Sequence, residues 1–353
     1  MGGVVGTGGA VGTGGAVGTG GAVGTGGLVG SGGVGGAGGS DAATQSDAAS
    51  GTVTEFIIAN TASEPWDLAV GSDGAIWFTE HTGNKIGRCT MAGDITEFAG
   101  LAVNSGPYGI AAGPNNDLWF TEFNANNIGR ITTAGTLTEF PIKSVGSGPI
   151  GIALGADANV WFTESSINKL GRITAVGLLT EFPITLTTGS TPSRVTLGPD
   201  QNIWFTENTG NKIGHVTVDG VISEATALGP GNTQPVGIVA GADGNIWFTL
   251  LGGNKIGRIG TSGGPGPGSG ATTYTLNTPG SQPALIVAGP IGSGTLWFTE
   301  YAGNAIGRIT TAGVLTEFLL KTPNSKPRGI VLGPDGNIWF AASGTGRIAR
   351  MVP

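Results

Sequence analysis

The sequence is poor in cysteine, histidine and charge. Its 353 residues include one cysteine and two histidines, and only 11% are charged. Cys89 is alone, so no disulfide can form within the chain and cysteine content does not report the compartment. With 16 Lys and Arg against 23 Asp and Glu, the net charge is −7. This balance excludes the basic face that binding to nucleic acid requires.

Long hydrophobic runs are also missing. No stretch reaches the 18 or more apolar residues of a membrane-spanning helix, so we predict no transmembrane span. Residues 1–51 are instead a Gly-rich, low-complexity tail and linker, in which five hexapeptides of the GGAVGT type fill residues 2–31. Glycine loses the most backbone entropy on ordering, so we expect a disordered tether rather than a hexapeptide β-helix.

The tail also bears on localisation. Met1-Gly2-Gly3 carries no basic segment of a signal peptide, and Gly6 stands where N-myristoylation requires Ser or Thr. Gly-rich tethers are typical of domains displayed outside the cytoplasm. We therefore expect an export signal upstream and an extracytoplasmic or surface-tethered location, while the given residues leave the compartment open.

Beyond the tail, one unit repeats seven times. A Trp-Phe pair recurs at spacings of 42 to 50 residues, with a proline 12 residues before it in six units and a basic residue 11 after it in all seven. Each unit contains four short apolar runs separated by Gly, Asn and Asp, which is the signature of strands and tight turns. A four-stranded unit of this period is typical of a β-propeller blade. The tryptophans are Trp77, Trp119, Trp161, Trp204, Trp247, Trp297 and Trp339.

The two ends of the repeat region predict a closed ring. The seventh unit stops after its third strand, at Arg350-Met351, and the missing fourth strand is found at 53–56, before the first unit. A ring closed in this way leaves no exposed sheet edge. We therefore predict that residues 52–353 form an all-β, closed seven-bladed propeller whose last blade is completed by the N-terminal strand. The Pro/Gly-rich loop 260–270 of the fifth blade is expected to be a flexible insertion.

Two sets of variable positions should share one mouth of the central channel, because the first strand of a blade begins where the second ends. One residue follows each proline and another follows each Phe-Thr-Glu, and these positions vary while the rest of the unit repeats. The first set is Trp66, Tyr108, Ile150, Ser193, Val236, Ala284 and Arg328. The second set is His81, Phe123, Ser165, Asn208, Leu251, Tyr301 and Ser343.

Charged and aromatic residues gather at the mouth where the seventh and first blades meet. This pattern indicates a mixed-charge ligand site with an aromatic wall; the alternative is a solvated mouth whose charges are paired. His81 is the candidate general base, and His215, where the other repeats have arginine, is interpreted as structural or surface-exposed. The repeated Glu80, Glu122, Glu164, Glu207 and Glu300 are interpreted as scaffold. The ligand-binding candidates are Glu64, Trp66, Asp67, Tyr108, Arg194, Lys326 and Arg328.

The repeat GPDGNIWFxExxGNKIGRITTAGxLTEF resembles that of the virginiamycin B lyases, also called streptogramin B lyases, over residues 52–353. The resemblance implies a carbon–oxygen lyase that opens a cyclic depsipeptide at its ester by elimination. It also implies a histidine base and a Mg²⁺ ion anchored by carboxylates.

This chain departs from the family pattern at the residues that carry this chemistry. Where the family has a histidine in the sixth blade, this chain has Ala284. Where the family reads Glu-Pro-His in the seventh blade, this chain reads Lys326-Pro327-Arg328, and Ser343 replaces a further Glu. Two cations would repel a dication at this place. We therefore expect neither a metal site nor a cofactor.

Three functions remain open from the sequence. The favoured one is a binding module for a small molecule, a peptide or a protein partner at the mouth, acting as a monomer. The second is an enzyme: a streptogramin B lyase with Mg²⁺, or another lyase or hydrolase with a relocated site at His81, Glu64 and Asp67. The third is a structural role without a ligand site.

Overall fold

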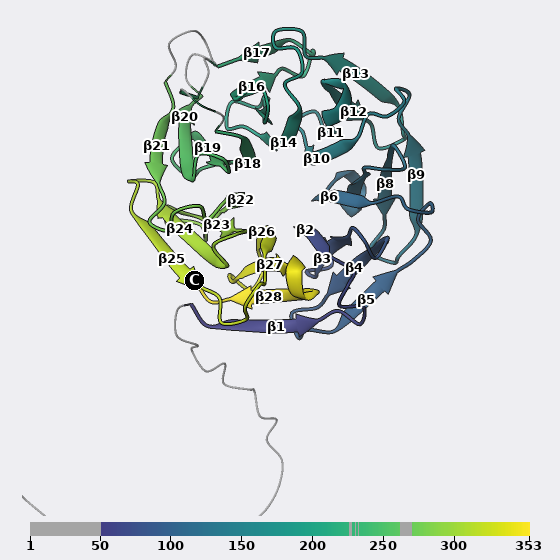
Figure 1. Ribbon diagram of the computed structural model, residues 1–353. Coiled ribbons are helices and arrows are strands. Elements are labelled where there is room, and N and C mark those ends of the chain that lie inside the picture. The colour runs from purple at the N-terminus through teal and green to yellow at the C-terminus, as the bar shows by residue number, and fades with distance from the viewer. Residues whose placement is uncertain (1–50, 226–227, 230, 232, 262–269) are drawn as a thin grey trace, which may run out of the picture. The chain divides into compact units, whose positions relative to one another are not determined.

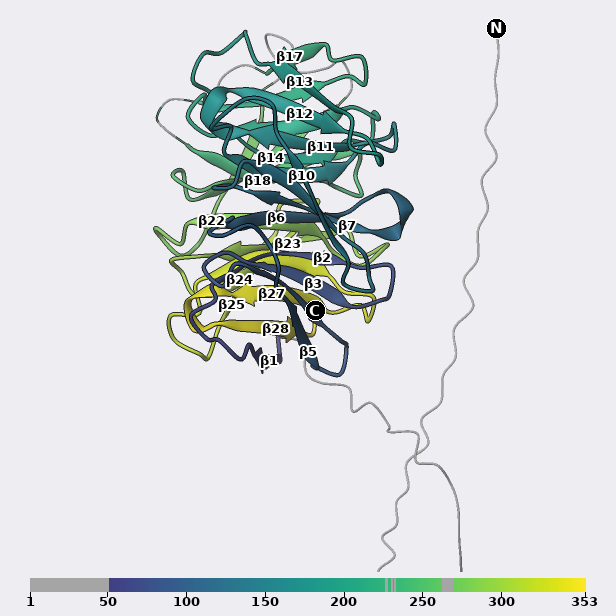
Figure 2. The ribbon, with the colours of Figure 1, turned by 90° about the vertical axis from the view of Figure 1, so that its right-hand side faces the viewer.

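The computed structural model describes residues 51–225, 228–229, 231, 233–261 and 270–353. The predictions for the tail and for most of the loop 260–270 fall outside these residues. The described residues form seven four-stranded antiparallel sheets arranged in a ring (Figure 1), which confirms the predicted all-β propeller and its seven blades. Strands of neighbouring blades, such as β6, β10 and β14, lie side by side in the view turned by 90° (Figure 2).

Every blade runs from an inner strand beside the ring axis to an outer strand at the circumference. Three short 3-10 turns, Pro114–Asn116, Ser165–Ile167 and Ser343–Thr345, are the only helical elements among the described residues. In blade order, the strands are β2 (Pro65–Val70), β3 (Ile76–Glu80), β4 (Lys85–Cys89), β5 (Ile95–Phe98); β6 (Pro107–Ala112), β7 (Leu118–Glu122), β8 (Asn127–Ile131), β9 (Leu137–Pro141); β10 (Pro149–Leu154), β11 (Val160–Glu164), β12 (Lys169–Ile173), β13 (Leu179–Pro183); β14 (Pro192–Leu197), β15 (Ile203–Glu207), β16 (Lys212–Val216), β17 (Ile222–Glu224); β18 (Pro235–Ala240), β19 (Asn245–Leu250), β20 (Lys255–Gly260), β21 (Thr272–Thr275); β22 (Pro283–Ala288), β23 (Thr295–Glu300), β24 (Ala305–Thr310), β25 (Leu315–Leu319); and β26 (Pro327–Leu332), β27 (Ile338–Ala342), β28 (Arg347–Met351), with β1 (Val53–Ile57).

The seventh blade is completed by the N-terminal strand, as predicted. Strand β1 pairs antiparallel with β28 in a register that places Val53 opposite Met351 and Ile57 opposite Arg347. Arg347 also forms an ion pair of 2.5 Å with Glu55 of β1. The sheet edge that the seventh blade would otherwise expose is therefore hydrogen-bonded.

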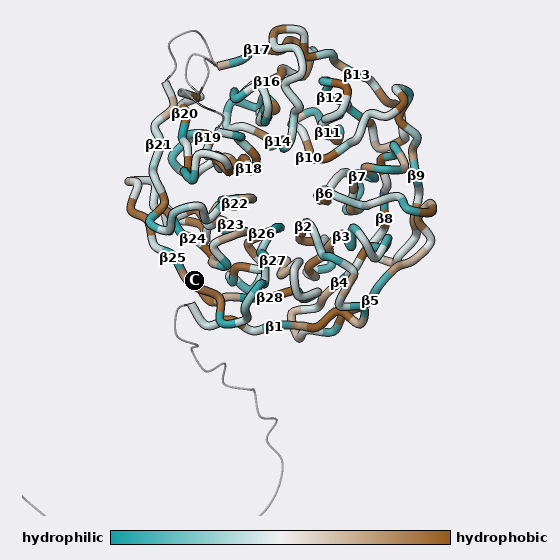
Figure 3. Tube along the Cα trace, viewed as in Figure 1, coloured by the Kyte–Doolittle hydropathy of each residue, from teal (hydrophilic) through white to brown (hydrophobic). Residues whose placement is uncertain are grey.

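The hydrophobic core lies between blades rather than in one central place. Trp77 of the first blade packs with Leu118 and Phe120 of the second, and equivalent clusters fill the other junctions. The repeated Trp and Phe of the second strands are at most 1% exposed. Hydrophobic segments accordingly recur in every blade (Figure 3). Cys89 is buried in this core.

A polar cluster fixes the tryptophan in most blades. In the first blade, the Trp77 indole N–H donates to Asp73 at 3.0 Å, and Arg88 pairs with the same carboxylate at 2.6 Å. Burial pushes the pKa of Asp73 upward, but these hydrogen bonds outweigh it and hold the pKa below its usual value. In the fourth blade His215 replaces the arginine, is buried and packs edge-on against Trp204, which supports a structural role.

Threonine hydroxyls connect neighbouring inner strands. In six blades the Thr of the second strand accepts the N–H of the second residue after the blade's own proline, at 2.8–3.1 Å. The same hydroxyl donates at 2.6–2.9 Å to the carbonyl of the residue after the next blade's proline. In the seventh blade Ala341 stands at this position, and Ser343 instead donates to the Pro65 carbonyl. The six threonines are Thr79, Thr121, Thr163, Thr206, Thr249 and Thr299.

Replacing Thr163 by valine should destabilise the ring. Valine keeps the shape, but the buried Gly151 N–H and Ser193 carbonyl lose their shared partner, which costs about 1–3 kcal/mol. We expect the thermal unfolding midpoint of Thr163→Val to fall by several degrees, measured by circular dichroism. Thr136→Val, at an exposed threonine, is the control. An unchanged midpoint for Thr163→Val would show that these bridges add nothing to stability.

Five blades bury a glutamate at the end of the second strand, beside a second glutamate of the outer strand. Burial, followed by the charge of Glu139, raises the pKa of Glu122 to about 8. Burial, together with Glu181, raises the pKa of Glu164 to about 7. The same causes raise the pKa values of Glu80, Glu207 and Glu300 to about 7. This repetition supports the interpretation of these residues as scaffold, since one site does not need five copies.

These raised pKa values predict that stability falls as pH rises. The folded state keeps protons that the unfolded chain releases above pH about 4.5, so this contribution is complete in acid and is lost as pH rises through 7 to 8. The lowered pKa of Asp73 affects stability only at more acidic pH. We expect the unfolding midpoint to fall between pH 5.5 and 8.5. The slope should be shallower for Glu122→Gln but unchanged for Asp219→Asn at an exposed control position. A midpoint that rises across this range would contradict the assignment.

Candidate functional site

Each inner strand begins with a β-bulge, and this bulge builds the mouth. The register of the first blade shifts between Pro65 and Leu68, and the same shift follows the proline of every blade. The two intervening residues, Trp66 and Asp67 in the first blade, leave the regular alternation of the strand. Bulges re-aim side chains next to functional sites. They explain why the variable positions can change while the sheets stay the same.

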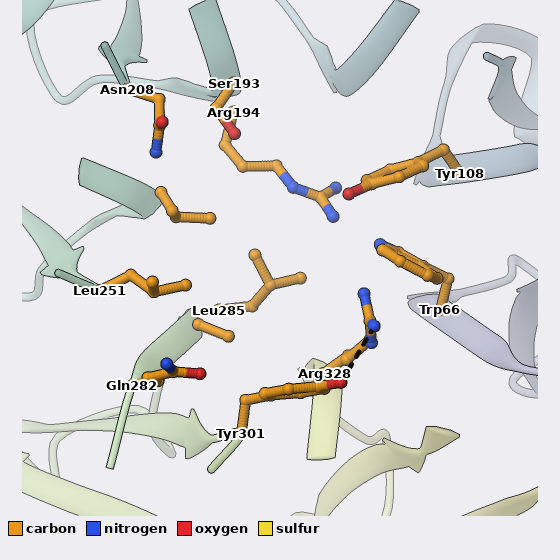
Figure 4. A pocket seen from close by; sticks show the side chains of 12 residues that line it. Trp66, Tyr108, Ser193, Arg194, Asn208, Leu251, Gln282, Leu285, Tyr301 and Arg328 are labelled. Atoms are coloured by element: carbon orange, nitrogen blue, oxygen red, sulfur yellow. Dashed lines mark hydrogen bonds between the residues drawn. The ribbon is translucent and has the colours of Figure 1, made fainter. Parts of the chain in front are cut away.

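Six of the seven residues of the first predicted set and three of the second line a common cavity of about 350 Å³ (Figure 4). Ile150, His81, Phe123 and Ser165 do not line this cavity, and Ser343 lies at an adjoining one. An adjoining cavity of about 250 Å³ is lined by Glu64, Lys326 and Ser343, and it shares Tyr301 and Arg328 with the first. The first cavity, hereafter the mouth cavity, is lined by Trp66, Tyr108, Ser193, Arg194, Asn208, Val236, Leu251, Gln282, Ala284, Leu285, Tyr301 and Arg328.

Arg328 lies between two aromatic rings in the mouth cavity. Its guanidinium carbon is 3.4 Å from the Trp66 ring centroid and 4.8 Å from that of Tyr301. Its nearest anion is Glu64, at an N–O distance of 3.5 Å. The Arg328 Nε atom is buried and has no hydrogen-bond partner among the described residues. Stacking therefore fixes the guanidinium plane while its hydrogen-bonding edge remains poorly used.

An aromatic cluster forms the wall beside Arg328. The Trp66 ring lies 4.5 Å from Tyr108 and 5.0 Å from His81, and Tyr108 lies 6.1 Å from Phe123, between centroids. Burial raises the pKa of the Tyr108 phenol, so it stays protonated. The Nδ1 atom of His81 is buried without a hydrogen-bond partner. No carboxylate among the described residues orients the His81 ring as the partner of a general base would.

Asp67 and Arg194 form an ion pair across the ring. They belong to the first and fourth blades, their N–O distance is 2.5 Å, and each residue is 8% exposed. Arg194 and Leu285 also line a smaller cavity of about 110 Å³, which includes Asp67 and lies between the inner strands. The pair was predicted as part of the ligand site. The structure shows that Asp67 is already occupied by Arg194, while Arg194 also faces the mouth cavity.

Asp67 and Arg194 are each the second residue after the proline of their blade. Four other blades have glycine at this position, for a steric reason. A Cβ at Gly151 would lie 2.7 Å from the Arg194 Cα atom, and one at Gly329 would lie 2.6 Å from that of Asp67. Each of these glycines therefore gives room to the side-chain-bearing residue of the next blade. Asp67, Arg194 and Leu285 are the three residues with side chains at this position.

Glu64 and Lys326, both predicted as ligand-binding candidates, belong to a position whose backbone is strained. The residue before each strand-one proline has a positive φ, between 46° and 60°, yet only two blades place glycine there. The others are Glu64, Thr191, Gln234, Gln282 and Lys326. Non-glycine residues at positive φ are costly and cluster at functional sites. The sequence carries a sign of this strain, because Gly106 and Gly148 stand at this position in two blades and polar residues stand there in the other five.

The donor set at the mouth does not suit a divalent metal ion. Among the described residues, no three His, Cys, Asp or Glu side chains gather in a way that could hold a metal. Of the four positions where the resemblance places catalytic groups, Ala284 and Arg328 line the mouth cavity, and Lys326, Arg328 and Ser343 line the adjoining one. The Ser343 hydroxyl donates to the Pro65 carbonyl.

No helix in the described part of the chain is long and apolar enough to cross a membrane.

Removing Asp67 should cost more than removing the whole ion pair. Asp67→Gly leaves the buried Arg194 charge unpaired, which costs about 3–5 kcal/mol. The double variant Asp67→Gly with Arg194→Gly restores the residue found in four other blades and should be more stable than the single variant. Chemical unfolding of both proteins tests this. A double variant as unstable as the sum of the two single variants would show that the residues act independently.

The comparisons with known proteins agree on one family. The model of the virginiamycin B lyase family matches residues 51–265 and 264–353. A streptogramin B lyase structure has 37% sequence identity and a TM-score of 0.79, covering 85% of this chain and 96% of its own. Virginiamycin B lyase from Staphylococcus aureus, in selenomethionine form, has 35% identity and a TM-score of 0.79, covering 86% and 99%.

A third structure is a catalytically inactive histidine-to-alanine variant of the Staphylococcus aureus lyase with quinupristin, at 36% identity and a TM-score of 0.79, covering 86% and 99%. A search of curated protein sequences gave no significant match. The family model covers the described propeller, and the identity extends over most of the chain. The chain therefore belongs to the virginiamycin B lyase family.

Proposed function

We propose that this chain is a small-molecule-binding propeller that does not carry out the elimination chemistry of its family. The observation that carries the proposal is Arg328, held between Trp66 and Tyr301 at the position where the resemblance places the family's base. A guanidinium is protonated at all working pH values and accepts no proton. It can bind an anion but cannot abstract a proton from carbon.

The histidines of this chain support the same proposal. The name of one related structure describes a catalytically inactive histidine-to-alanine variant of the Staphylococcus aureus lyase. This chain has only two histidines. His215 packs against Trp204 in the fourth blade, and its nearest carboxylate, Asp200, is 4.0 Å away. The His81 ring is tilted by 50° against Trp66, and its Nδ1 has no hydrogen-bond partner among the described residues. Neither histidine is hydrogen-bonded to the carboxylate that commonly orients a general base.

The groups around the adjoining cavity also argue against the Mg²⁺ ion that the family implies. Mg²⁺ prefers several oxygen ligands in octahedral geometry. This cavity offers the Glu64 carboxylate together with the cationic side chains of Lys326 and Arg328. The ion does not fit this set, and we derive no chemical step through it.

The size of the site favours a small ligand over a protein partner. A concave cavity of about 350 Å³ lies at the lower end of the range of small-molecule sites. It joins apolar walls with a few polar groups, as such sites commonly do. A hydrolase or lyase centred on His81, Glu64 and Asp67 is less favoured, because Asp67 pairs with Arg194 and Glu64 is held by Arg328 and Thr82.

The absence of lyase activity can be tested directly. Purified protein is incubated with quinupristin, with and without Mg²⁺, beside the Staphylococcus aureus enzyme, and the linear product is sought by mass spectrometry. We expect product only from the Staphylococcus aureus enzyme. Catalytic product formation by this chain would overturn the proposal, and its loss in His81→Ala would then identify a relocated base.

Binding is tested separately with a chemically mixed library of small acids, amines and neutral compounds. At least one compound should raise the unfolding midpoint of the wild type and have a smaller effect on Arg328→Met, because ligand binding stabilises the folded state. If no compound stabilises the wild type, or if every effect persists in Arg328→Met, the mouth cavity is not the binding site.

A further inference from the structure

The mouth cavity has two chemically different sides (Figure 4). On one side, the side chains of Arg194 and Arg328 extend toward Trp66 and Tyr108, with Arg328 over the Trp66 ring and Arg194 over the Tyr108 ring. On the other side, Leu251 and Leu285 project into the cavity from the fifth and sixth blades. Val236 and Ala284 extend this apolar side. A ligand that satisfies both sides combines an anionic group with an apolar group.

The cationic side has unused hydrogen-bonding capacity. Arg328 has five N–H donors, and its contacts are 3.4 Å to the Tyr301 hydroxyl and 3.5 Å to Glu64, both long for hydrogen bonds. Its buried Nε lacks a partner altogether. Buried donors without acceptors are rare in folded proteins, and a bound acceptor is one explanation for them. The Trp66 and Tyr301 rings lie 3.4 Å and 4.8 Å from the guanidinium carbon, so they restrict the directions from which such an acceptor can approach.

The charges around the cavity favour a single negative charge. Arg194 is neutralised by Asp67 at 2.5 Å, whereas Arg328 has only the longer contact to Glu64. A carboxylate can receive two parallel N–H bonds from one guanidinium edge. Its remaining lone pairs would face Arg194, whose guanidinium lies 5.5 Å from the Tyr108 ring centroid at the same side of the cavity.

Glu64 contacts Arg328 from the side of the adjoining cavity, and it would compete with a ligand carboxylate for this guanidinium. Its Oε1 faces Arg328, its Oε2 accepts the Thr82 hydroxyl at 2.8 Å, and its side chain is 35% exposed. The backbone of Glu64 is held at a φ of 55°. A partly exposed carboxylate at 3.5 Å is a weak partner that a ligand carboxylate can displace.

We propose that the mouth cavity binds a small amphipathic carboxylate, with its carboxylate on Arg328, its apolar group against Leu251 and Leu285, and Glu64 as a displaceable internal competitor. This inference rests on the proposed binding function and specifies its ligand class. Asn208 and Gln282 also line the cavity and can hydrogen-bond an amide in such a ligand.

The test uses three matched probes in isothermal titration with the full chain. N-acetylphenylalanine carries the carboxylate and the apolar group, its amide removes the charge, and N-acetylglycine removes the apolar group. We expect the affinity for N-acetylphenylalanine to exceed that for the other two by about tenfold or more, since hydrogen bonds to a charged group contribute about 1.5–3 kcal/mol. A peptide ending in phenylalanine that binds more tightly than the free acid would identify the natural source as a peptide C-terminus.

Variants test the roles of the two charged residues. Arg328→Met should weaken N-acetylphenylalanine binding by about tenfold or more, and Glu64→Gln should strengthen it because the internal competitor is removed. Lys143→Met, at an exposed position outside the cavity, makes the same charge change as Arg328→Met and should have no effect. Unfolding midpoints of all variants show whether each one is folded.

Two results would overturn the ligand assignment. The first is an amide probe that binds as tightly as the acid, which would leave the binding function intact but remove the carboxylate. The second is wild-type protein that binds none of the probes at millimolar concentration. In that case the library screen decides separately whether the cavity binds another class of molecule. Weaker binding by Glu64→Gln would refute its role as a competitor.

Discussion

The threonine hydroxyl between inner strands is the interaction on which the architecture of the mouth depends. In six blades it receives an N–H from its own blade and donates to a carbonyl of the next. That carbonyl belongs to the residue directly after the proline, which is the variable position of the mouth. The backbone of this residue is therefore fixed by the scaffold, whatever its side chain is. As a result, tyrosine, isoleucine, serine and arginine occupy equivalent places at the mouth without altering the ring.

The β-bulge and the glycines complete this separation of scaffold and site. The bulge directs two residues of each inner strand away from the sheet pattern. Glycine at the second of them lets the next blade approach closely, as Gly329 does for Asp67. Where Asp67 and Arg194 carry side chains instead, these meet across the ring. The Asp67–Arg194 pair is the result: it joins blades that are not neighbours, and Arg194 carries its charge into the mouth cavity.

The chain thus keeps the family's scaffold and departs from the expected family pattern at a few positions of the mouth. Three features recur around the ring and serve stability: a tryptophan stacked on an aromatic ring of the outer strand, as Trp77 on Phe98, the Asp–Trp–Arg clusters, and the buried glutamates. Ala284, Lys326, Arg328 and Ser343 lie at the mouth, where the scaffold leaves the side chains free to vary. Membership of the family follows from the recurring residues. Activity depends on the few variable ones, and we infer that these now favour anion binding over proton abstraction.

The sequence by itself determined the number of blades, the four strands of each and the closure of the ring by the N-terminal strand. These features follow from local patterns: a regular Trp-Phe spacing, turn residues between apolar runs and a missing strand at one end. It also placed Trp66, Tyr108 and Arg328 at one mouth, because the order of strands within a blade fixes the face on which each strand ends. Only the tertiary structure decided which charges pair. Asp67 and Arg194 are 127 residues apart and meet because the ring has a width that spans one arginine side chain. The stacking of Arg328 on Trp66 likewise depends on side-chain directions set by a bulge in each strand, which no local sequence pattern specifies.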